Sequence, residues 1–234
     1  MAVVKSWFPV AISLSIGLIA LVDTATSGAS VNESATGVED DSSKRTVAQL
    51  LASKLALLDS LQSNYEQRLL TPSGDTLEQS SGYLVLQKPR LKWQTLKPFP
   101  QTLVVADGEL RIYDPDLMQM VIQPIAQDMN APMQILLQPH RLTTPGFQVQ
   151  KQPSNETGSN QHSVFTVSSP DSGTLYASIA LTFSGDELIK LVIFDHEYQR
   201  TEINFLGMSP FAKDAGGPDP FILDLPVGTD VVRG

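Results

Sequence analysis

Cysteine is absent from all 234 residues of the chain. This excludes disulfides, thiolate metal sites, iron–sulfur clusters and cysteine nucleophiles. It also excludes a lipid-modified mature N-terminus, because lipid attachment there requires a cysteine. Positive charge is scarce as well, since the formal net charge is −9 and the pI about 4.7. The chain therefore lacks the basic field that nucleic-acid binding normally requires, and we expect no nucleic-acid partner.

Recognisable catalytic motifs are also missing. The histidines, His140, His162 and His196, show neither HExxH nor HxH spacing, so no zinc site is expected. No nucleophile elbow, P-loop or dinucleotide fingerprint occurs. Asp195 precedes His196 directly, but neighbouring residues in a strand point to opposite faces and do not form a simple dyad. We expect neither an enzyme nor a bound cofactor or metal.

The carboxylates between residues 107 and 116 are the best remaining candidates for metal ligands. Asp114-Pro115-Asp116 resembles a D-x-D clamp, but the residues that follow lack the further ligands of a calcium loop. Asp-Pro-Asp is typical of a hairpin turn, and so is Asp107-Gly108. We therefore interpret both segments as turns between strands.

The first thirty residues have the layout of a targeting segment. Lys5 precedes a mostly apolar run from Phe8 to Val22, and small residues follow up to Ala29. This layout predicts a secretory signal peptide over residues 1–29. A membrane anchor is the alternative, but a run of about fifteen residues is short for a hydrocarbon core of ~30 Å. Export without disulfides points to a bacterial periplasm.

Two helices are predicted after the signal peptide. Residues 30–45 are polar and acidic and are expected to be a disordered lead-in to the folded domain. Thr46 and Gln49 fit a capping box at the start of a helix over 47–61, whose leucines recur at helical spacing. A second, short helix is expected within 129–138.

Alternation of apolar and polar residues with a period of two dominates the rest of the chain. Turn signals separate the alternating segments. Many short strands joined by tight turns favour a mainly β domain over 46–234, an antiparallel meander curled into a barrel or half-barrel. The segments are 103–106, 110–113, 118–123, 175–183 and 201–205.

Methionine is concentrated in one part of the sequence, at Met118, Met120, Met129 and Met133. Methionine is flexible and suits a surface that takes variable apolar ligands. An ordinary filled core is the alternative, because the interior of a barrel is filled in some proteins and hollow in others.

A longer pattern runs from Gly82 to Gln119 and reads GYLVLQKPRLKWQTLKPFPQTLVVADGELRIYDPDLMQ. It contains a G-x-L strand, a basic residue before proline, a tryptophan, another proline and a DG…YDP hairpin. The segments PMQILL and FILDLPVGTDVV follow later. This ordered set resembles the periplasmic outer-membrane lipoprotein carriers, the LolA family, over nearly all of residues 46–232.

The resemblance implies an incomplete antiparallel β-barrel, or half-barrel, with an apolar cavity closed by a lid of short α-helices. It also implies a periplasmic chaperone for acylated lipoproteins. Such a carrier takes its cargo from an inner-membrane ABC transporter and delivers it to an outer-membrane lipoprotein receptor. We expect it to act as a monomer.

The resemblance further implies roles for single residues. Most members have an arginine before the first proline, which latches the lid to backbone carbonyls. Lys88 occupies that position with a single ammonium in place of a five-donor fork, and Arg90 is the alternative latch. The resemblance assigns apolar residues to the cavity and lid: Leu51, Leu55, Leu58, Leu91, Trp93, Met133, Leu136 and Leu137. The strand pattern adds Tyr113, Met118 and Met120 to the apolar wall.

Three other interpretations compete with a carrier. The first is the receptor of the same fold, which is itself a lipoprotein and therefore needs the missing cysteine. The second is a periplasmic module that senses lipids or lipoproteins and regulates a membrane partner, which predicts a second domain after the barrel. The third is a small lipid hydrolase, for which no nucleophile elbow or suitable base is present.

Overall fold

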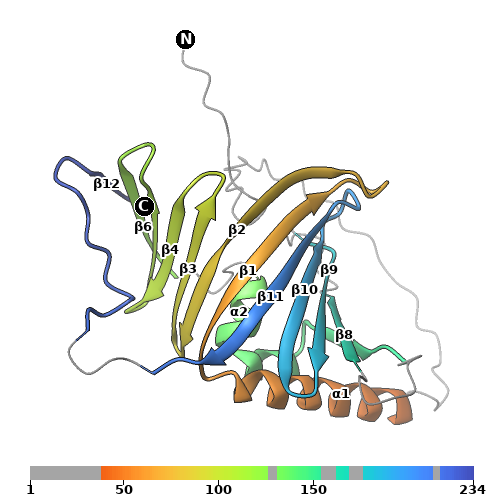
Figure 1. Ribbon diagram of the computed structural model, residues 1–234. Coiled ribbons are helices and arrows are strands. Elements are labelled where there is room, and N and C mark those ends of the chain that lie inside the picture. The colour runs from red at the N-terminus through yellow and green to blue at the C-terminus, as the bar shows by residue number, and fades with distance from the viewer. Residues whose placement is uncertain (1–37, 126–130, 154–161, 169–175, 213–216) are drawn as a thin grey trace, which may run out of the picture.

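One curved sheet contains twelve strands, and helix α1 lies across one end of it (Figure 1). The computed structural model describes residues 38–125, 131–153, 162–168, 176–212 and 217–234. The helices are α1 (Val38–Leu57), α2 (Ala131–Leu137) and the 3-10 helix η1 (Pro139–Thr143). The strands are β1 (Ser60–Leu70), β2 (Thr76–Gln87), β3 (Arg90–Lys97), β4 (Gln101–Ala106), β5 (Glu109–Asp114), β6 (Gln119–Pro124), β7 (Gln148–Lys151), β8 (His162–Ser168), β9 (Ser178–Ser184), β10 (Glu187–Phe194), β11 (Arg200–Pro210) and β12 (Asp230–Arg233).

The sheet consists of two meanders that meet at a seam. The strand order is β12-β6-β5-β4-β3-β2-β1-β11-β10-β9-β8-β7. Strands β1 to β6 form one meander and β7 to β11 the other, and β1 pairs with β11 in antiparallel register at the seam. β12 returns to pair in parallel with β6. The two ends of the sheet do not pair with each other, so the predicted mainly β fold with an incomplete barrel is confirmed.

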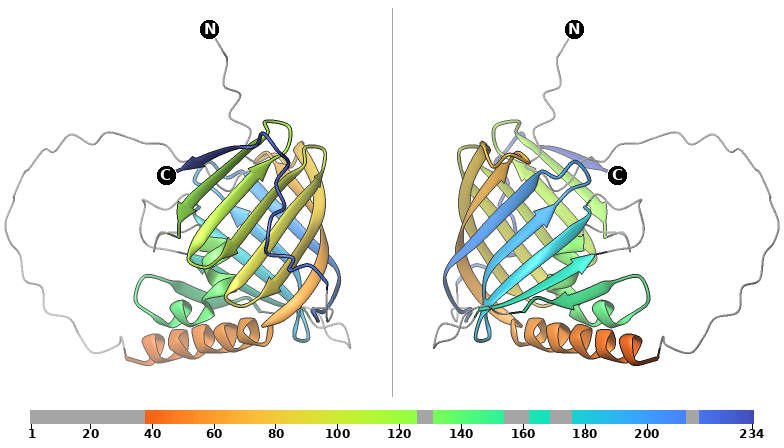
Figure 2. Two further views of the ribbon diagram at one scale, coloured as in Figure 1. Left: turned by 90° about the vertical axis from the view of Figure 1, so that its left-hand side faces the viewer. Right: turned by 90° about the vertical axis from the view of Figure 1, so that its right-hand side faces the viewer.

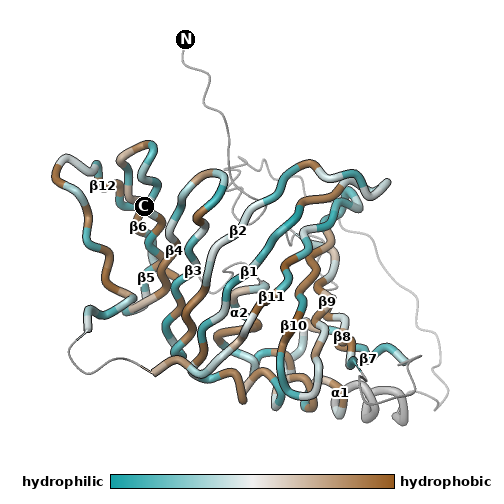
Figure 3. The backbone as a smooth tube through the Cα atoms, viewed as in Figure 1, coloured by the Kyte–Doolittle hydropathy of each residue, from teal (hydrophilic) through white to brown (hydrophobic). Residues whose placement is uncertain are grey.

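Apolar and polar residues alternate along the strands, which gives the sheet two different faces (Figure 3). In β9, Ile179, Leu181 and Phe183 are buried, and the residues between them are partly exposed. A strand with one fully covered face requires this period of two. We call the face turned toward α2 the concave face and the opposite one the convex face (Figure 2).

Two hydrophobic clusters cover these faces. The larger one lies on the concave face and joins residues of α1, α2 and η1 to strand residues from both meanders. The smaller one lies on the convex face, where Phe221 packs with Val85, Val104 and Ala106. The C-terminal segment that carries Phe221 crosses the outer side of the first meander before it reaches β12 (Figure 2, left).

Helix α1 begins earlier than the sequence predicts. The predicted range was 47–61, but the helix runs from Val38 to Leu57 and includes part of the expected lead-in 30–45. The part of that lead-in before Val38 lies outside the described residues. Thr46 is inside the helix, so the predicted capping box is wrong. Adding a turn to an existing helix costs far less free energy than nucleating a new helix. The polar composition of this segment therefore does not prevent the extension of α1.

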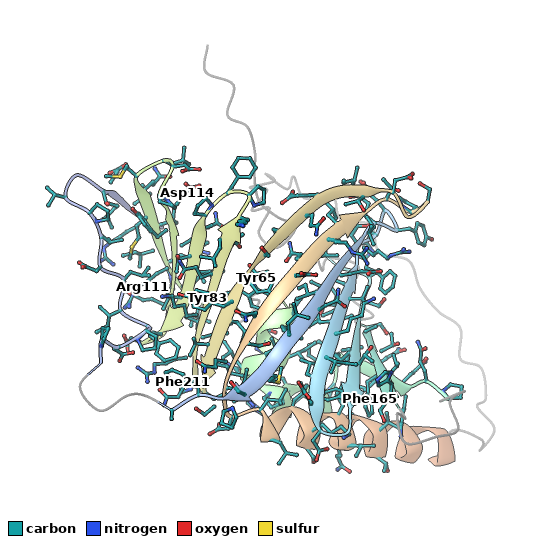
Figure 4. All side chains as sticks on the ribbon, in the orientation of Figure 1. Tyr65, Tyr83, Arg111, Asp114, Phe165 and Phe211 are labelled. Atoms are coloured by element: carbon teal, nitrogen blue, oxygen red, sulfur yellow. The ribbon has the colours of Figure 1, made fainter. Side chains whose placement is uncertain are left out.

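The carboxylates near residue 114 belong to turns, as predicted. The Asp114 Oδ1 atom accepts hydrogen bonds from the backbone N–H groups of Asp116 at 3.0 Å and Leu117 at 3.1 Å. Asp107 and Gly108 have φ values of 55° and 76°, which suit a tight hairpin turn. Asp114 lies at the end of the sheet far from α1 (Figure 4).

Candidate functional site

Three leucines at the C-terminal end of α1 form a stripe against the concave face. Leu51 and Leu55 are four residues apart and lie on one side of the helix, and Leu58, the first residue after it, is buried in the same cluster. Leu51 and Leu55 are 0 % exposed, whereas Leu57 is 67 % exposed. The stripe belongs to the same cluster as Phe165 of β8, which lies beside α1 (Figure 4).

Helices α2 and η1 complete the layer over the concave face. Ile135, Leu136 and Leu137 of α2 are buried in the larger cluster, and Met133 packs against it. Leu142 of η1 is buried there too, and η1 contacts both α1 and α2. The second helix predicted within 129–138 is thus confirmed. We call α1, α2 and η1 together the helical cover.

Aromatic side chains occupy the middle of the concave face. The ring centroid of Trp93 in β3 lies 5.0 Å from that of Tyr65 in β1 and 6.3 Å from that of Phe205 in β11. Burial raises the pKa of Tyr65, although hydrogen bonds with Thr95 and Trp93 oppose this shift. Tyr65 thus presents a neutral phenol whose hydroxyl lies 2.8 Å from the Thr95 Oγ1 atom.

Gly82 fixes the distance between the strands that carry these rings. A Cβ atom added at Gly82 would lie 1.9 Å from the backbone oxygen of Gln94 in β3. On its other side Gly82 pairs with Tyr65 of β1. Only glycine permits this approach, because any side chain would overlap the neighbouring backbone.

Lys88 connects the β2–β3 turn to the last turn of α1. Its Nζ atom donates a hydrogen bond to the backbone oxygen of Leu55 at 2.6 Å. Burial lowers the pKa of Lys88, and the charge of Asp59 opposes part of this shift. Carbonyl groups in the last helical turn lack a full set of intrahelical partners, and a cation is favourable there.

Arg90 makes its contacts on the convex face. Its guanidinium forms an ion pair with Asp219 at 2.9 Å and lies 4.2 Å from the ring centroid of Phe221. It also donates a hydrogen bond to the Gln87 side chain. All three partners lie outside the helical cover, and two of them belong to the C-terminal segment. The two candidate latch residues therefore contact different parts of the molecule.

The strand register divides the remaining predicted cavity residues. Leu91 is buried in the larger cluster, and Trp93 packs against it. Ile112 of β5 belongs to the larger cluster and therefore lies on the concave face, which places its neighbour Tyr113 on the opposite face. Met120 of β6 pairs directly with Tyr113 and shares that face. Tyr113 and Met120 thus lie on the convex face, contrary to the expected apolar wall. Met118, 38 % exposed, is in the β5–β6 turn with φ 50°.

Several residues of the concave face escaped the sequence analysis. Tyr65 and Phe165 are fully buried there. Alternation of apolar and polar residues within the segments LQSNY and HSVFTV was the available signal. Alternation alone does not say which of the two strand faces points toward the core. Lys54 of α1 was missed as well, because a single lysine on a helix has no distinguishing pattern.

Glu202 of β11 is a buried charge on the convex face. Its carboxylate accepts hydrogen bonds at 3.1 Å from Arg68, Lys190 and Arg200. Burial alone would raise the pKa of Glu202, but the hydrogen bonds and charges of Lys190 and Arg68 outweigh it and lower the pKa. This carboxylate is therefore ionised and ties β1, β10 and β11 together.

The described ranges contain no group of three or more His, Cys, Asp or Glu residues placed to hold a metal ion. Among the helices in the described part of the chain, none is both long and apolar enough to cross a membrane. Methionine 129, one of the clustered methionines, lies outside the described residues.

An open, mainly antiparallel sheet with helices over its apolar concave face defines the structural class. The family model described as "Outer membrane lipoprotein carrier protein LolA" matches residues 56–215. The chain therefore belongs to the LolA family.

Relatives cover most of the chain. An outer-membrane lipoprotein carrier protein from Hahella chejuensis is 28% identical over 89% of this chain and 94% of its own length. One from Xanthomonas campestris pv. campestris is 32% identical over 75% of this chain and 82% of its own length. An uncharacterized conserved protein from Thermus thermophilus shares the fold, with a TM-score of 0.52 and 13% identity over 80% of this chain and 99% of its own.

Proposed function

We propose that the chain is a periplasmic carrier that holds the acyl chains of lipoproteins against its concave face. It receives them from an inner-membrane ABC transporter and delivers them to an outer-membrane receptor. It acts as a monomer, without catalysis, cofactor or metal. The names of its relatives support the carrier role, and the sequence resemblance over 46–232 supports the two membrane partners.

The observation that carries this proposal is the continuous apolar surface beneath the helical cover. Leu91 comes from the first meander and Phe183 from the second, and both are fully buried. The helical cover meets them with leucines such as Leu51 and Leu55. An acyl chain has the same apolar chemistry as these side chains, so it can replace them against the sheet without leaving polar groups unpaired.

This exchange of the helical cover for cargo makes binding reversible. An acyl chain of about sixteen carbons represents about 12 kcal/mol of burial, at about 0.8 kcal/mol per methylene. Each leucine that leaves the sheet gives up roughly 1.5–3 kcal/mol. The lost packing of the helical cover offsets part of the gain from the cargo. A receptor can therefore remove a lipoprotein that would otherwise be bound too tightly.

Lys88 is the latch in this proposal. Its hydrogen bond to the Leu55 oxygen holds the last turn of α1 to the β2–β3 turn at 2.6 Å. Arg90 instead holds the C-terminal segment to the convex face. Lys88→Leu should increase the affinity for an acyl probe, because the closed state loses a contact, and Arg90→Leu should leave it unchanged. The reverse result would identify Arg90 as the latch.

The carrier function is tested by release of a lipoprotein. Residues 30–234 are added to spheroplasts depleted of their own carrier, and a triacylated lipoprotein is measured in the soluble fraction. We expect a soluble complex of one lipoprotein with one carrier. If the lipoproteins stay on the inner membrane, the carrier proposal fails. Release without subsequent transfer to receptor-containing outer membranes would favour the sensing module instead.

Two substitutions in α1 provide a matched pair for this assay. Leu55→Glu places a carboxylate in the apolar space that the helical cover and the acyl chains share, where an unpaired charge is unfavourable in both states, and should change the amount of lipoprotein released. Leu57→Glu changes the same residue type two positions away, at a site that is 67 % exposed, and should release lipoproteins normally. Circular dichroism should show that both variants retain the sheet. Equal activity of the two variants would show that the concave face does not hold the cargo.

A further inference from the structure

A second lysine holds the last turn of α1. The Lys54 Nζ atom donates hydrogen bonds to the backbone oxygen of Gly185 and to the Asp186 Oδ1 atom, each at 2.8 Å. The same atom lies 5.5 Å from the ring centroid of Phe183. The Lys54 side chain is only 18 % exposed, whereas that of Asp186 is 71 % exposed. The ammonium thus fits between the helix, the β9–β10 turn and the edge of the concave face.

The two lysine contacts reach α1 from different meanders. Lys88 extends from the β2–β3 turn to the Leu55 oxygen, while Lys54 extends from α1 to the β9–β10 turn. Strands β1 and β11 lie between these two hairpins in the sheet. One helical turn therefore links both meanders at the end of a sheet that is not closed (Figure 1).

We propose that Lys54, Gly185 and Asp186 form a second latch of the helical cover, and that ionic strength regulates it. This inference rests on the carrier function proposed above. Lys54 is a positioning residue: α1 can leave the concave face only after its ammonium has left both oxygens. Phe183 lies directly below and is 0 % exposed, so release of Lys54 also uncovers apolar surface for an acyl chain.

The two latches differ in their response to salt. Asp186 is largely exposed, so counterions screen its attraction to Lys54. The Lys88 bond goes to a neutral carbonyl in a partly buried place, and screening affects it less. A pair with one exposed member contributes modestly, which corresponds to a change of up to about fivefold in the closing equilibrium. We therefore expect acyl-chain affinity to rise by up to about fivefold between low and high salt.

The test compares the protein with Lys54→Met, Asp186→Asn and the charge-swapped double variant Lys54→Glu/Asp186→Lys. A fluorescent fatty acid is titrated at about 20 mM and about 500 mM salt, where the Debye length falls severalfold. Both single variants should bind the fatty acid more tightly at low salt and lose most of the salt dependence. The double variant should regain part of the weaker binding and of the salt dependence, because the swap restores the ion pair but not the hydrogen bond to the Gly185 oxygen. Lys92→Met, which removes an ammonium 5.7 Å from the Tyr83 ring on the convex face, is the control.

Hydrogen exchange separates this inference from the carrier proposal. The amides of residues 46–57 should exchange faster in Lys54→Met and Asp186→Asn than in the wild type, with or without ligand. If the wild type binds no acyl chain but these amides respond, the carrier proposal fails and the latch remains. If neither exchange nor salt dependence changes, or the double variant restores nothing, the second latch is refuted.

Discussion

Leu51 allows the sharpest test of competition between the helical cover and the cargo. Its side chain is 0 % exposed, and Leu51→Ala removes three buried carbons. At about 0.8 kcal/mol per methylene this costs roughly 2.4 kcal/mol, and the remaining cavity brings the loss to about 2–5 kcal/mol. The closed state, in which the helical cover lies on the sheet, bears the full loss of packing. In the loaded state acyl chains fill the space that the Leu51 side chain leaves. Because each 1.4 kcal/mol is a factor of ten, acyl binding should strengthen about tenfold or more.

Urea unfolding measures the loss of stability, and titration with a fluorescent fatty acid measures the affinity. Val104→Ala is the matched control, because Val104 is also 0 % exposed but packs in the smaller cluster on the convex face. It should lower the free energy of unfolding without strengthening acyl binding. If Leu51→Ala loses stability and its affinity stays the same or falls, the helical cover and the cargo do not compete and the reasoning is wrong.

Three further predictions concern the sheet itself. The pKa of Glu202 is lowered, so the folded protein binds fewer protons at this carboxyl group than the unfolded chain does. The stability that the ionised carboxylate contributes is therefore lost as pH falls from 4.5 through the lowered pKa. Urea unfolding at about pH 7 and pH 3 should therefore show a smaller acid loss in Glu202→Gln than in the wild type. Gly82→Ala should destabilise the fold by at least about 1–3 kcal/mol in the same assay, because the new methyl group overlaps the Gln94 backbone. Thr201→Val should be neutral or stabilising by up to about 1 kcal/mol, because the buried Thr201 hydroxyl has no hydrogen-bond partner in the described structure. A clear destabilisation by Thr201→Val would show that this hydroxyl is satisfied.

The strands and turns were predictable because their signals are local. Alternation identified the segments that became β4, β5, β6, β9 and β11, and turn residues such as Asp114 marked their ends. The leucine stripe of α1 was equally legible, because positions 51, 55 and 58 repeat with the helical period. These features depend on neighbours within a few residues, which a sequence displays directly.

The assignment of residues to faces needed the pairing register. Ile112 and Met120 both belong to alternating segments. Because Met120 pairs with Tyr113, the neighbour of Ile112, the side chains of Ile112 and Met120 lie on opposite faces. A hairpin shifted by one residue would have reversed this result. The different contacts of Lys88 and Arg90 were also beyond the sequence, because the two residues precede and follow a chain reversal that separates their partners. The start of α1 was missed because extending an existing helix costs little, so the capping motif at Thr46 does not set its first residue.

The seam between β1 and β11 has a consequence for how the chain reaches its folded state. Ser63 and Leu206, which meet there, are 143 residues apart in the chain. Closing a loop of that size costs about 4 kcal/mol of chain entropy, while every other antiparallel pairing among the described strands joins strands that are neighbours in sequence. The two meanders can therefore form early as hairpins, and the slow step is their meeting. Until that step, each half exposes the apolar strands that the other half and α1 later cover, so nascent molecules are most prone to aggregation before the seam forms.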